Sequence, residues 1–207
     1  YFYMKTERKP YLFRLIYISI KNAPVRTEKK GKTFMEKMIR AAKAGEPDAF
    51  TRLMKSQMQS MYKTAGAILM NDEDIADAVS DTILTCWESI GCLREEKYFR
   101  TWMTRILINK CNDIIRRKKY ILQADIPDKP YIDSGFENTE WKETINMVSD
   151  KYRLVLVLYY IEDFNTKDIS EMLGMPEGTV RSRLARGREQ LRQIYEEREY
   201  ETGGQAL

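Results

Sequence analysis

The sequence predicts an all-α protein of two small helical domains joined by a flexible acidic linker, the C-terminal domain being a helix-turn-helix. From Met35 onward apolar residues recur at helical spacing, and no stretch shows sustained strand alternation. Residues 120–138 break this pattern with prolines, Gly135 and several Asp and Glu side chains. A chain of 207 residues is long enough for two modest cores.

The first domain is predicted to span residues 35–119. Its helices are expected over about 35–44, over 47–69, between Asn71-Asp72 and Gly91, and over about 97–119. The last two have apolar sides that we expect to form the core. These sides comprise Ile75, Val79, Ile83, Trp87 and Ile90, and then Phe99, Trp102, Met103, Ile106, Leu107 and Ile114.

The positive charge of the chain is concentrated in residues 1–34. This segment holds nine Lys or Arg and two Glu, which leaves 26 basic and 29 acidic side chains in the remainder. A uniformly basic nucleic-acid-binding surface is therefore excluded, and contacts to nucleic acid must come from local clusters. We interpret residues 1–34 as a non-native or upstream extension that ends near Met35. The alternative is a basic regulatory or membrane-surface arm, without stable membrane insertion because Tyr11–Ile20 is too short to span a bilayer.

The composition also limits the chemistry. The chain has no histidine, which excludes Ser-His-Asp and Cys-His catalysis and any metal site built on imidazole. Cys86, Cys92 and Cys111 fit no zinc spacing, and their odd number favours a reducing, cytoplasmic compartment over a disulfide framework. We interpret them as structural thiols, with redox sensing as the alternative. We expect a non-enzyme with no catalytic residue, metal or cofactor.

Residues 165–194 have the pattern of a helix-turn-helix. Asn165 and Asp168 have capping-box spacing, Gly174 can end the first helix, and a second helix is predicted to start near Glu177–Thr179. On the second helix Val180, Leu184 and positions 187, 191 and 194 form one packing face. The other faces carry arginines, whose planar fork suits guanine edges and phosphates. The candidate DNA-binding residues are Thr179, Arg181, Ser182, Arg183, Arg186 and Arg188, with Arg192 as a further phosphate contact and Arg183 on the flank of the packing face.

An acidic face is predicted on the helix before Gly91. Asp74, Asp77, Asp81 and Glu88 are spaced so that they share one side, where like charges repel unless a basic partner covers them. Three interpretations stay open: a protein-docking face, a solvated face and a divalent-metal site.

The helix over 97–119 carries a face of opposite sign. Amide and cationic side chains can bind base edges and phosphates, and Tyr98 could stack on an unpaired base. The face comprises Thr101, Arg105, Asn109, Asn112, Arg116 and Lys119, reinforced by Arg117 and Lys118.

Three stretches in this order resemble the conserved domains of extracytoplasmic-function (ECF) sigma factors of the sigma-70 superfamily. They are DIADAVSDTIL (74–84), FRTWMTRILINKCNDIIRRKK (99–119) and DKYRLVLVLYYIEDFNTKDISEMLGMPEGTVRSRLARGREQLR (150–192). Ser80 and Ala76 depart from the family, which usually has Gln and Glu there.

The resemblance implies a role for each stretch. The first would dock on the coiled coil of the largest RNA polymerase subunit through Asp74, Asp77, Val79, Asp81, Thr82 and Leu84. The loop Gly91–Tyr98 and the next helix would bind the minus-ten element, where a base is flipped, through Tyr98, Arg105, Asn109, Asn112, Arg116 and Arg117. The second domain would engage the polymerase flap through Leu154–Tyr160 and bind the minus-thirty-five element. An anti-sigma factor is a further expected partner.

The resemblance assigns residues 35–119 to sigma region 2, 120–138 to the linker, 139–198 to sigma region 4 and 199–207 to a tail. It predicts a subunit that binds core polymerase and directs promoter recognition, strand opening and initiation. The alternatives are a stand-alone helix-turn-helix regulator, a metal-dependent nuclease or phosphotransferase built on Asp74, Asp77 and Asp81, and a purely structural interaction protein.

Overall fold

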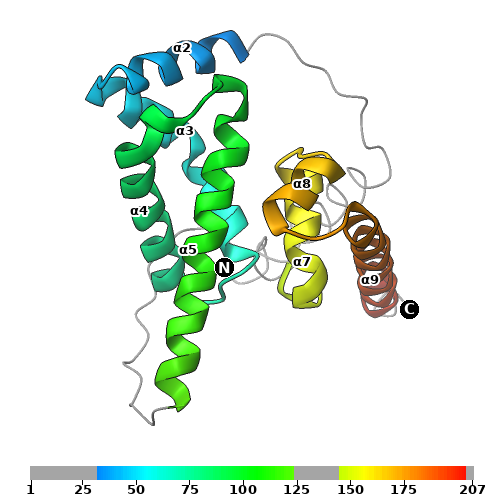
Figure 1. Cartoon of the computed structure of the whole chain (residues 1–207). Helices are drawn as coiled ribbons and strands as arrows, with labels where there is room; N and C mark the ends of the chain where they lie inside the picture. Colours follow the sequence, from blue (N-terminus) through cyan, green and yellow to red (C-terminus); the bar gives the residue numbers. More distant parts are fainter. Residues whose placement is uncertain (1–31, 124–144, 204–207) are drawn as a thin grey trace, which may run out of the picture. The chain divides into compact units, whose positions relative to one another are not determined.

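A computed structural model describes residues 32–123 and 145–203, and the regular elements within these ranges are helical (Figure 1). The described residues divide into two compact units, 32–123 and 145–203, so the predicted all-α, two-domain organisation is confirmed. The predictions for residues 1–31 and for the linker beyond 123 lie outside the described residues. In the part of the chain that is described, no helix is both long and apolar enough to cross a membrane.

The helices of the first unit begin and end at residues whose backbone preferences explain the boundaries. Gly45 has a left-handed φ of 88° between the first two helices. The Asn71 side chain caps the third helix by accepting from the backbone N–H groups of Glu73 and Asp74. The unit comprises α2 (Lys32–Lys43), α3 (Pro47–Gly66), α4 (Asp72–Ser89), the short turns η2 (Ile90–Cys92) and η3 (Glu96–Tyr98), and α5 (Phe99–Gln123).

One hydrophobic cluster joins α2 through α5, and α4 packs along α5 (Figure 1). The apolar sides predicted for these two helices supply much of the cluster, with Ile75, Val79, Met103 and Leu107 almost fully buried. Trp87 is the exception, because 41% of it is exposed. Its ring packs edge-on against Phe50 at 4.9 Å between centroids, so it borders the core instead of filling it.

Several boundaries differ from the sequence prediction. Helix α2 begins at Lys32, inside the predicted extension, and α5 continues to Gln123, inside the predicted linker. Helix α9 (Glu177–Gly203) likewise includes five residues of the predicted tail. The two C-terminal extensions have a local reason: residues 120–123 contain no helix breaker, and the charged sequence after 198 favours helix until Gly203.

The second unit contains α7 (Asp150–Leu156), a π-helical turn η4 (Val157–Ile161), α8 (Thr166–Leu173) and α9. The predicted helix-turn-helix signals are confirmed individually. The Asn165 side chain accepts from the Asp168 N–H at 2.8 Å, and its amide donates to the Asp168 carboxylate at 2.8 Å. Gly174 ends α8 with a φ of 61°.

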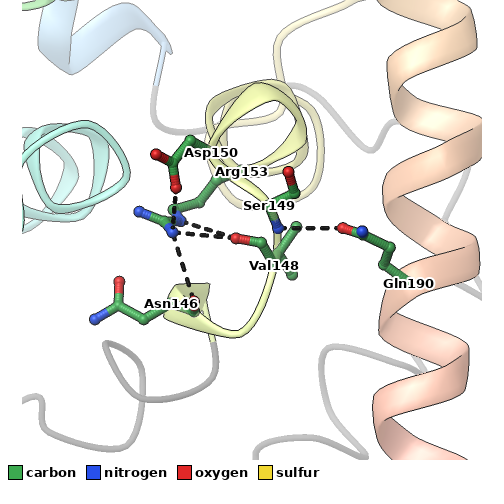
Figure 2. Close-up of polar contacts among 6 residues, drawn as sticks. All are labelled: Asn146, Val148, Ser149, Asp150, Arg153 and Gln190. Atoms are coloured by element: carbon green, nitrogen blue, oxygen red, sulfur yellow. Dashed lines mark hydrogen bonds and ion pairs between the residues drawn. The ribbon is translucent and has the colours of Figure 1, made fainter.

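A buried arginine, Arg153, holds the turn that precedes α7 through hydrogen bonds (Figure 2). Only 3% of Arg153 is exposed, and its guanidinium donates to the Val148 carbonyl from Nε at 3.3 Å and from Nη2 at 3.1 Å. Nη2 also contacts the carbonyl of Asn146 at 3.5 Å and the carboxylate of Asp150 at 2.8 Å. Because Asp150 is almost fully exposed, we expect the carbonyl bonds to stabilise this turn more than the ion pair.

Helices α7 and α9 approach closely at two points. The Gln190 side chain of α9 accepts from the Ser149 N–H at the start of α7, at 3.1 Å (Figure 2). At Gly187, a Cβ would lie 2.9 Å from Leu156 Cδ1 and 3.1 Å from Tyr152 Cβ. Helix α9 is thus held against α7 along one side, and its opposite side is left outward.

Replacement of Gly187 by alanine should destabilise the second unit. Alanine favours helix by about 1 kcal/mol, but overpacking a tight interface costs about 1–3 kcal/mol. We expect a net loss near 1 kcal/mol, measured by thermal or urea unfolding. The matched control is Gly178→Ala, where the added Cβ has no neighbour within 4 Å and stability should not fall. Equal effects of the two substitutions would contradict the packing argument.

Replacement of Arg153 by methionine should also destabilise this unit. The substitution retains an apolar stem but leaves the buried Val148 carbonyl without its donors, at a cost of about 1–3 kcal/mol. Chemical denaturation monitored by circular dichroism measures the loss. Asp150→Asn, which alters the exposed partner, should change stability by less than about 0.5 kcal/mol. A larger effect at Asp150 than at Arg153 would refute the assignment of the carbonyl bonds as dominant.

Candidate nucleic-acid interface

The outward side of α9 presents most of the predicted DNA-binding residues to solvent. Val180, Leu184 and Leu191 are buried, as expected for the packing face. Arg183 is half-buried on the flank of this face, and Thr179 is also half-buried. The exposed members of the predicted set are Arg181, Ser182, Arg186 and Arg188.

Arg181 is oriented by a glutamate one turn earlier. Its Nη2 lies 2.7 Å from Oε1 of Glu177, and the same oxygen accepts from the Thr166 hydroxyl at 2.5 Å. The bonds from Thr166 and then from Arg181 lower the pKa of the Glu177 carboxyl, so it is ionised at neutral pH. Glu177 therefore links the first residue of α8 to the second helix of the motif.

The arginines further along α9 differ in their partners. Nη1 of Arg188 donates to the Tyr160 hydroxyl at 3.3 Å. Burial acts to raise the pKa of Tyr152, but the cations of Lys151 and Arg186 lower it. Arg192 instead pairs with Glu189 at 2.7 Å and with Glu196 at 2.6 Å. A phosphate contact by Arg192 would have to compete with both carboxylates. Both glutamates lie three or four residues from Arg192, the spacing at which side chains on one helix pair.

The predicted face of α5 is directed away from the core. Thr101 is half-buried, Arg116 pairs with Asp113, and the Lys118 ammonium lies 2.9 Å from the Asp74 carboxylate of α4. The exposed members of the face are Arg105, Asn109, Asn112, Arg116, Arg117 and Lys119.

An open groove of about 730 Å³ lies between α4 and the C-terminal half of α5. It is lined by Asp81, Lys110, Asp113, Arg116, Arg117 and Tyr120. Its lining contains charges of both signs, so it links the acidic side of α4 to the basic end of α5.

The loop Gly91–Tyr98 leads into α5 and exposes an aromatic ring. Half of Tyr98 is exposed, and the Lys97 ammonium lies 4.7 Å from its ring centroid. Phe99 is 1% exposed and belongs to the core, which leaves Tyr98 as the stacking candidate at this position.

The predicted docking set on α4 is only partly at the surface. Asp77 and Asp81 are exposed, and 57% of Leu84 is exposed. Val79 and Thr82 are buried at 2% and 0%, so their side chains are turned toward the core of this unit. Both positions face the core because they lie one turn of helix from other buried residues.

Two further members of the acidic face, Glu88 and Asp74, differ in exposure. Glu88 is exposed, whereas the Asp74 side chain is 16% exposed and paired with Lys118. Trp87 is 41% exposed beside Leu84, and the sequence assigned it to the core on its helical spacing alone.

The described carboxylates and thiols bear on the metal-site and redox-sensing interpretations. Within residues 32–123 and 145–203 no group of three or more Cys, Asp or Glu side chains is arranged to hold a metal ion. Burial raises the pKa of the Cys86 and Cys111 thiols to about 12, so both are protonated at neutral pH and poorly reactive. Cys92 is exposed.

Comparison with known proteins agrees with this arrangement. The model for Sigma-70 region 2 matches residues 53–120, and the model for Sigma-70, region 4 matches residues 139–191. The chain is 29% identical to the ECF RNA polymerase sigma factor SigW of Bacillus subtilis over 178 residues, 76% of this chain and 95% of SigW. It is 27% identical to the ECF RNA polymerase sigma factor SigM of Mycobacterium tuberculosis, over 76% of this chain and 82% of SigM.

Solved structures share the fold. CnrH, in complex with the cytosolic domain of CnrY, matches with a TM-score of 0.58 and 22% identity over 78% of this chain and 97% of CnrH. The sigma factor RpoE of Bartonella quintana, in complex with the anti-sigma factor NepR, matches with a TM-score of 0.60 and 19% identity over 71% of this chain and 96% of RpoE. With both conserved regions present in order along one chain, and relatives matched over most of their length, this protein belongs to the ECF group of the sigma-70 family.

Proposed function

We propose that this chain binds core RNA polymerase and directs it to selected promoters, where it supports strand opening and transcription initiation. The observation that carries the proposal is the presence of sigma region 2 and sigma region 4 in one chain, in family order. A stand-alone helix-turn-helix regulator would use residues 139–191 and would leave the whole region 2 match without a role.

We assign recognition of the minus-thirty-five element to α9. A helix in the major groove reads base edges with residues near its N-terminus. Arg181 and Ser182 lie in that part of α9 and are exposed, so we assign them to base contacts. Arg186 and Arg188 lie further along α9 and are exposed, and Arg188 is also held by the Tyr160 hydroxyl, which suits contacts to phosphate. Thr179 and Arg183, both half-buried, would support this surface from its edges.

We assign the minus-ten element to the loop Gly91–Tyr98 and to the exposed face of α5. Asn109 and Asn112 offer amides to base edges, and the arginines along the same face offer cations to phosphates. Tyr98 offers a stacking surface for an unpaired base, worth about 1–3 kcal/mol. Binding an unpaired strand favours the opened promoter without any catalytic group.

We assign docking on the polymerase coiled coil to the outward side of α4. Exposed carboxylates at Asp77, Asp81 and Glu88 flank the exposed apolar surface of Leu84 and Trp87. An apolar patch with a charged rim is typical of a protein interface, and a basic partner would relieve the repulsion among the carboxylates.

Flap engagement through Leu154–Tyr160 has fewer residues available than the sequence implied. Val155, Leu156, Val157 and Leu158 are buried at 3% or less. The half-buried Leu154, Tyr159 and Tyr160 are the members of the run that a flap can reach. We therefore restrict this proposed contact to those three side chains.

The mechanism depends on joining two weak DNA contacts. Each unit alone offers a small basic surface, so its affinity for duplex DNA should be low. When polymerase holds both units, the second contact becomes intramolecular, and overall affinity can rise by about 10²–10⁴-fold. Selectivity then requires both promoter elements at a suitable spacing.

The solved relatives also indicate a regulator. CnrH is seen with CnrY and RpoE with the anti-sigma factor NepR. By analogy we propose that an anti-sigma protein restrains this chain by covering the polymerase-binding side of α4. We place this exchange in the cytoplasm, where polymerase acts.

Reconstitution tests the proposed function directly. Purified chain should bind sigma-free core polymerase and start transcripts at defined positions on a promoter library. Transcripts that start at the same places with and without the chain would refute the proposal.

Substitution of Arg181 should change promoter selectivity. Arg181→Ala should cost about 1–3 kcal/mol at one position of the minus-thirty-five element and relax the base preference there. Arg192→Ala is the matched control, because Arg192 is already paired with two glutamates of its own helix. Transcription from a library randomised at the element measures both. The base-contact assignment fails if Arg181→Ala weakens all sequences equally.

Substitution of Leu84 should weaken polymerase binding. Leu84→Arg places a cation in the exposed apolar patch and should lower affinity for core polymerase by at least about 10-fold, or 1.4 kcal/mol. Folding should be preserved because the side chain is 57% exposed. Gln59→Arg on the exposed side of α3 adds the same single charge and is the control. Fluorescence anisotropy with labelled chain measures affinity, and unchanged binding by Leu84→Arg would exclude this docking side.

A further inference from the structure

We propose that Lys43, the last residue of α2, is a positioning residue that fixes the loop Gly91–Tyr98 in the shape required to capture an unpaired promoter base. This inference rests on the function proposed above for the loop. It adds α2 to the strand-opening apparatus, although α2 presents none of the DNA-contacting residues assigned above.

The Lys43 ammonium holds the loop at two points. Its Nζ donates to the Leu93 carbonyl at 2.7 Å, a contact between residues 50 apart in sequence. The same Nζ lies 3.7 Å from Oε1 of Glu96. The two side chains are 24% and 29% exposed, so this ion pair is better shielded from water than a surface pair.

The loop backbone needs such contacts because it has little regular structure. It consists of two single turns, η2 and η3, separated by residues in extended conformation. The Leu93 side chain is 5% exposed and anchors the loop in the core. The loop is therefore held at three groups: the buried Leu93 side chain, the Leu93 carbonyl and the Glu96 carboxylate.

Lysine at the end of α2 suits this arrangement chemically. An ammonium has three donors and a compact charge, so it can serve a carbonyl and a carboxylate at once. Its position at the C-terminus of the helix also places it near the negative end of the helix dipole. The pKa of Glu96 is lowered, first by its own backbone N–H and further by the Lys43 charge, which keeps the carboxylate ionised.

The same loop presents the binding groups. Tyr98 is half exposed, with the Lys97 ammonium 4.7 Å from its ring and the Glu95 carboxylate 2.7 Å from that ammonium. A ring for stacking and a cation that is itself paired with Glu95 are thus held side by side. Because the loop is already ordered, capture of a base loses less conformational entropy than it would on a mobile loop.

The test is promoter opening by the reconstituted complex of full-length chain and core polymerase. Lys43→Met retains the stem and removes the charge, and Lys55→Met on the exposed side of α3 is the matched control. We expect Lys43→Met to reduce opening by about 10-fold, followed by a fluorescent base analogue in the minus-ten element. Binding to a single-stranded minus-ten oligonucleotide should fall similarly, while affinity for core polymerase stays unchanged.

A double-mutant cycle isolates the contact with Glu96. If Lys43 acts partly through that carboxylate, Glu96→Gln should reduce opening less in the Lys43→Met background than in the wild type. Lys43→Arg should restore part of the activity, because it returns a cation with several donors. Additive effects of Lys43→Met and Glu96→Gln would overturn the inference.

The remaining outcomes separate the inference from the proposed function. If the wild-type complex opens promoters and Lys43→Met matches Lys55→Met, the positioning role is refuted and the sigma function stands. If Lys43→Met lowers the melting temperature and polymerase affinity together, the residue is structural and the inference is again refuted. If the wild-type complex neither opens promoters nor binds the single-stranded oligonucleotide, the proposed function of the loop itself fails.

Discussion

The structure depends on one constraint: each long helix buries one side in a small core and must leave its other side for partners. In α4 the side with Ile75 and Val79 is buried, and the side with Asp77, Asp81 and Leu84 remains at the surface. Burial of a fully enclosed aliphatic side chain is worth about 1.5–3 kcal/mol, which no single surface contact exceeds. The core therefore sets the rotation of each helix, and the outward faces follow from it.

Charge pairing within the fold then decides which surface groups are available. Lys118 and Arg192 would both extend a basic surface if sequence alone is considered. The first is paired with Asp74 across two helices, and the second with Glu189 and Glu196 on its own helix. Arg181 also has a glutamate partner, but Glu177 is itself anchored by Thr166, so the pair orients the arginine. Similar ion pairs thus have different consequences, according to what else the carboxylate contacts.

Two sets of close contacts hold the proposed DNA-binding elements in place. Close contact at Gly187 and the bond from Ser149 to Gln190 fix α9 against α7. In the other unit, Lys43 fastens the loop that precedes α5. Neither set of contacts uses a residue assigned to DNA binding, so both can keep a binding surface in shape without occupying it.

By itself the sequence determined the fold class, the helix-turn-helix and the family. These depend on local signals that act within a few residues: helical periodicity, the caps at Asn71 and Asn165, and the left-handed glycines at 45 and 174. Such signals also predicted which side of α5 and α9 would be outward. They did not predict where α5 and α9 end, at Gln123 and Gly203. No helix-breaking residue stands at the predicted ends, so the helices continue past them.

Only the tertiary structure decided the contacts between residues distant in sequence. Periodicity already placed Val79 on the apolar side of α4 and left Leu84 off it, but the burial of Thr82 and the exposure of Trp87 depend on how α4 packs against its neighbours. The link from Lys43 to Leu93, the pair of Asp74 with Lys118 and the burial of Arg153 likewise arise from how helices pack. Periodicity defines the faces of one helix, whereas the neighbour that each face meets is fixed by the packing of all of them together.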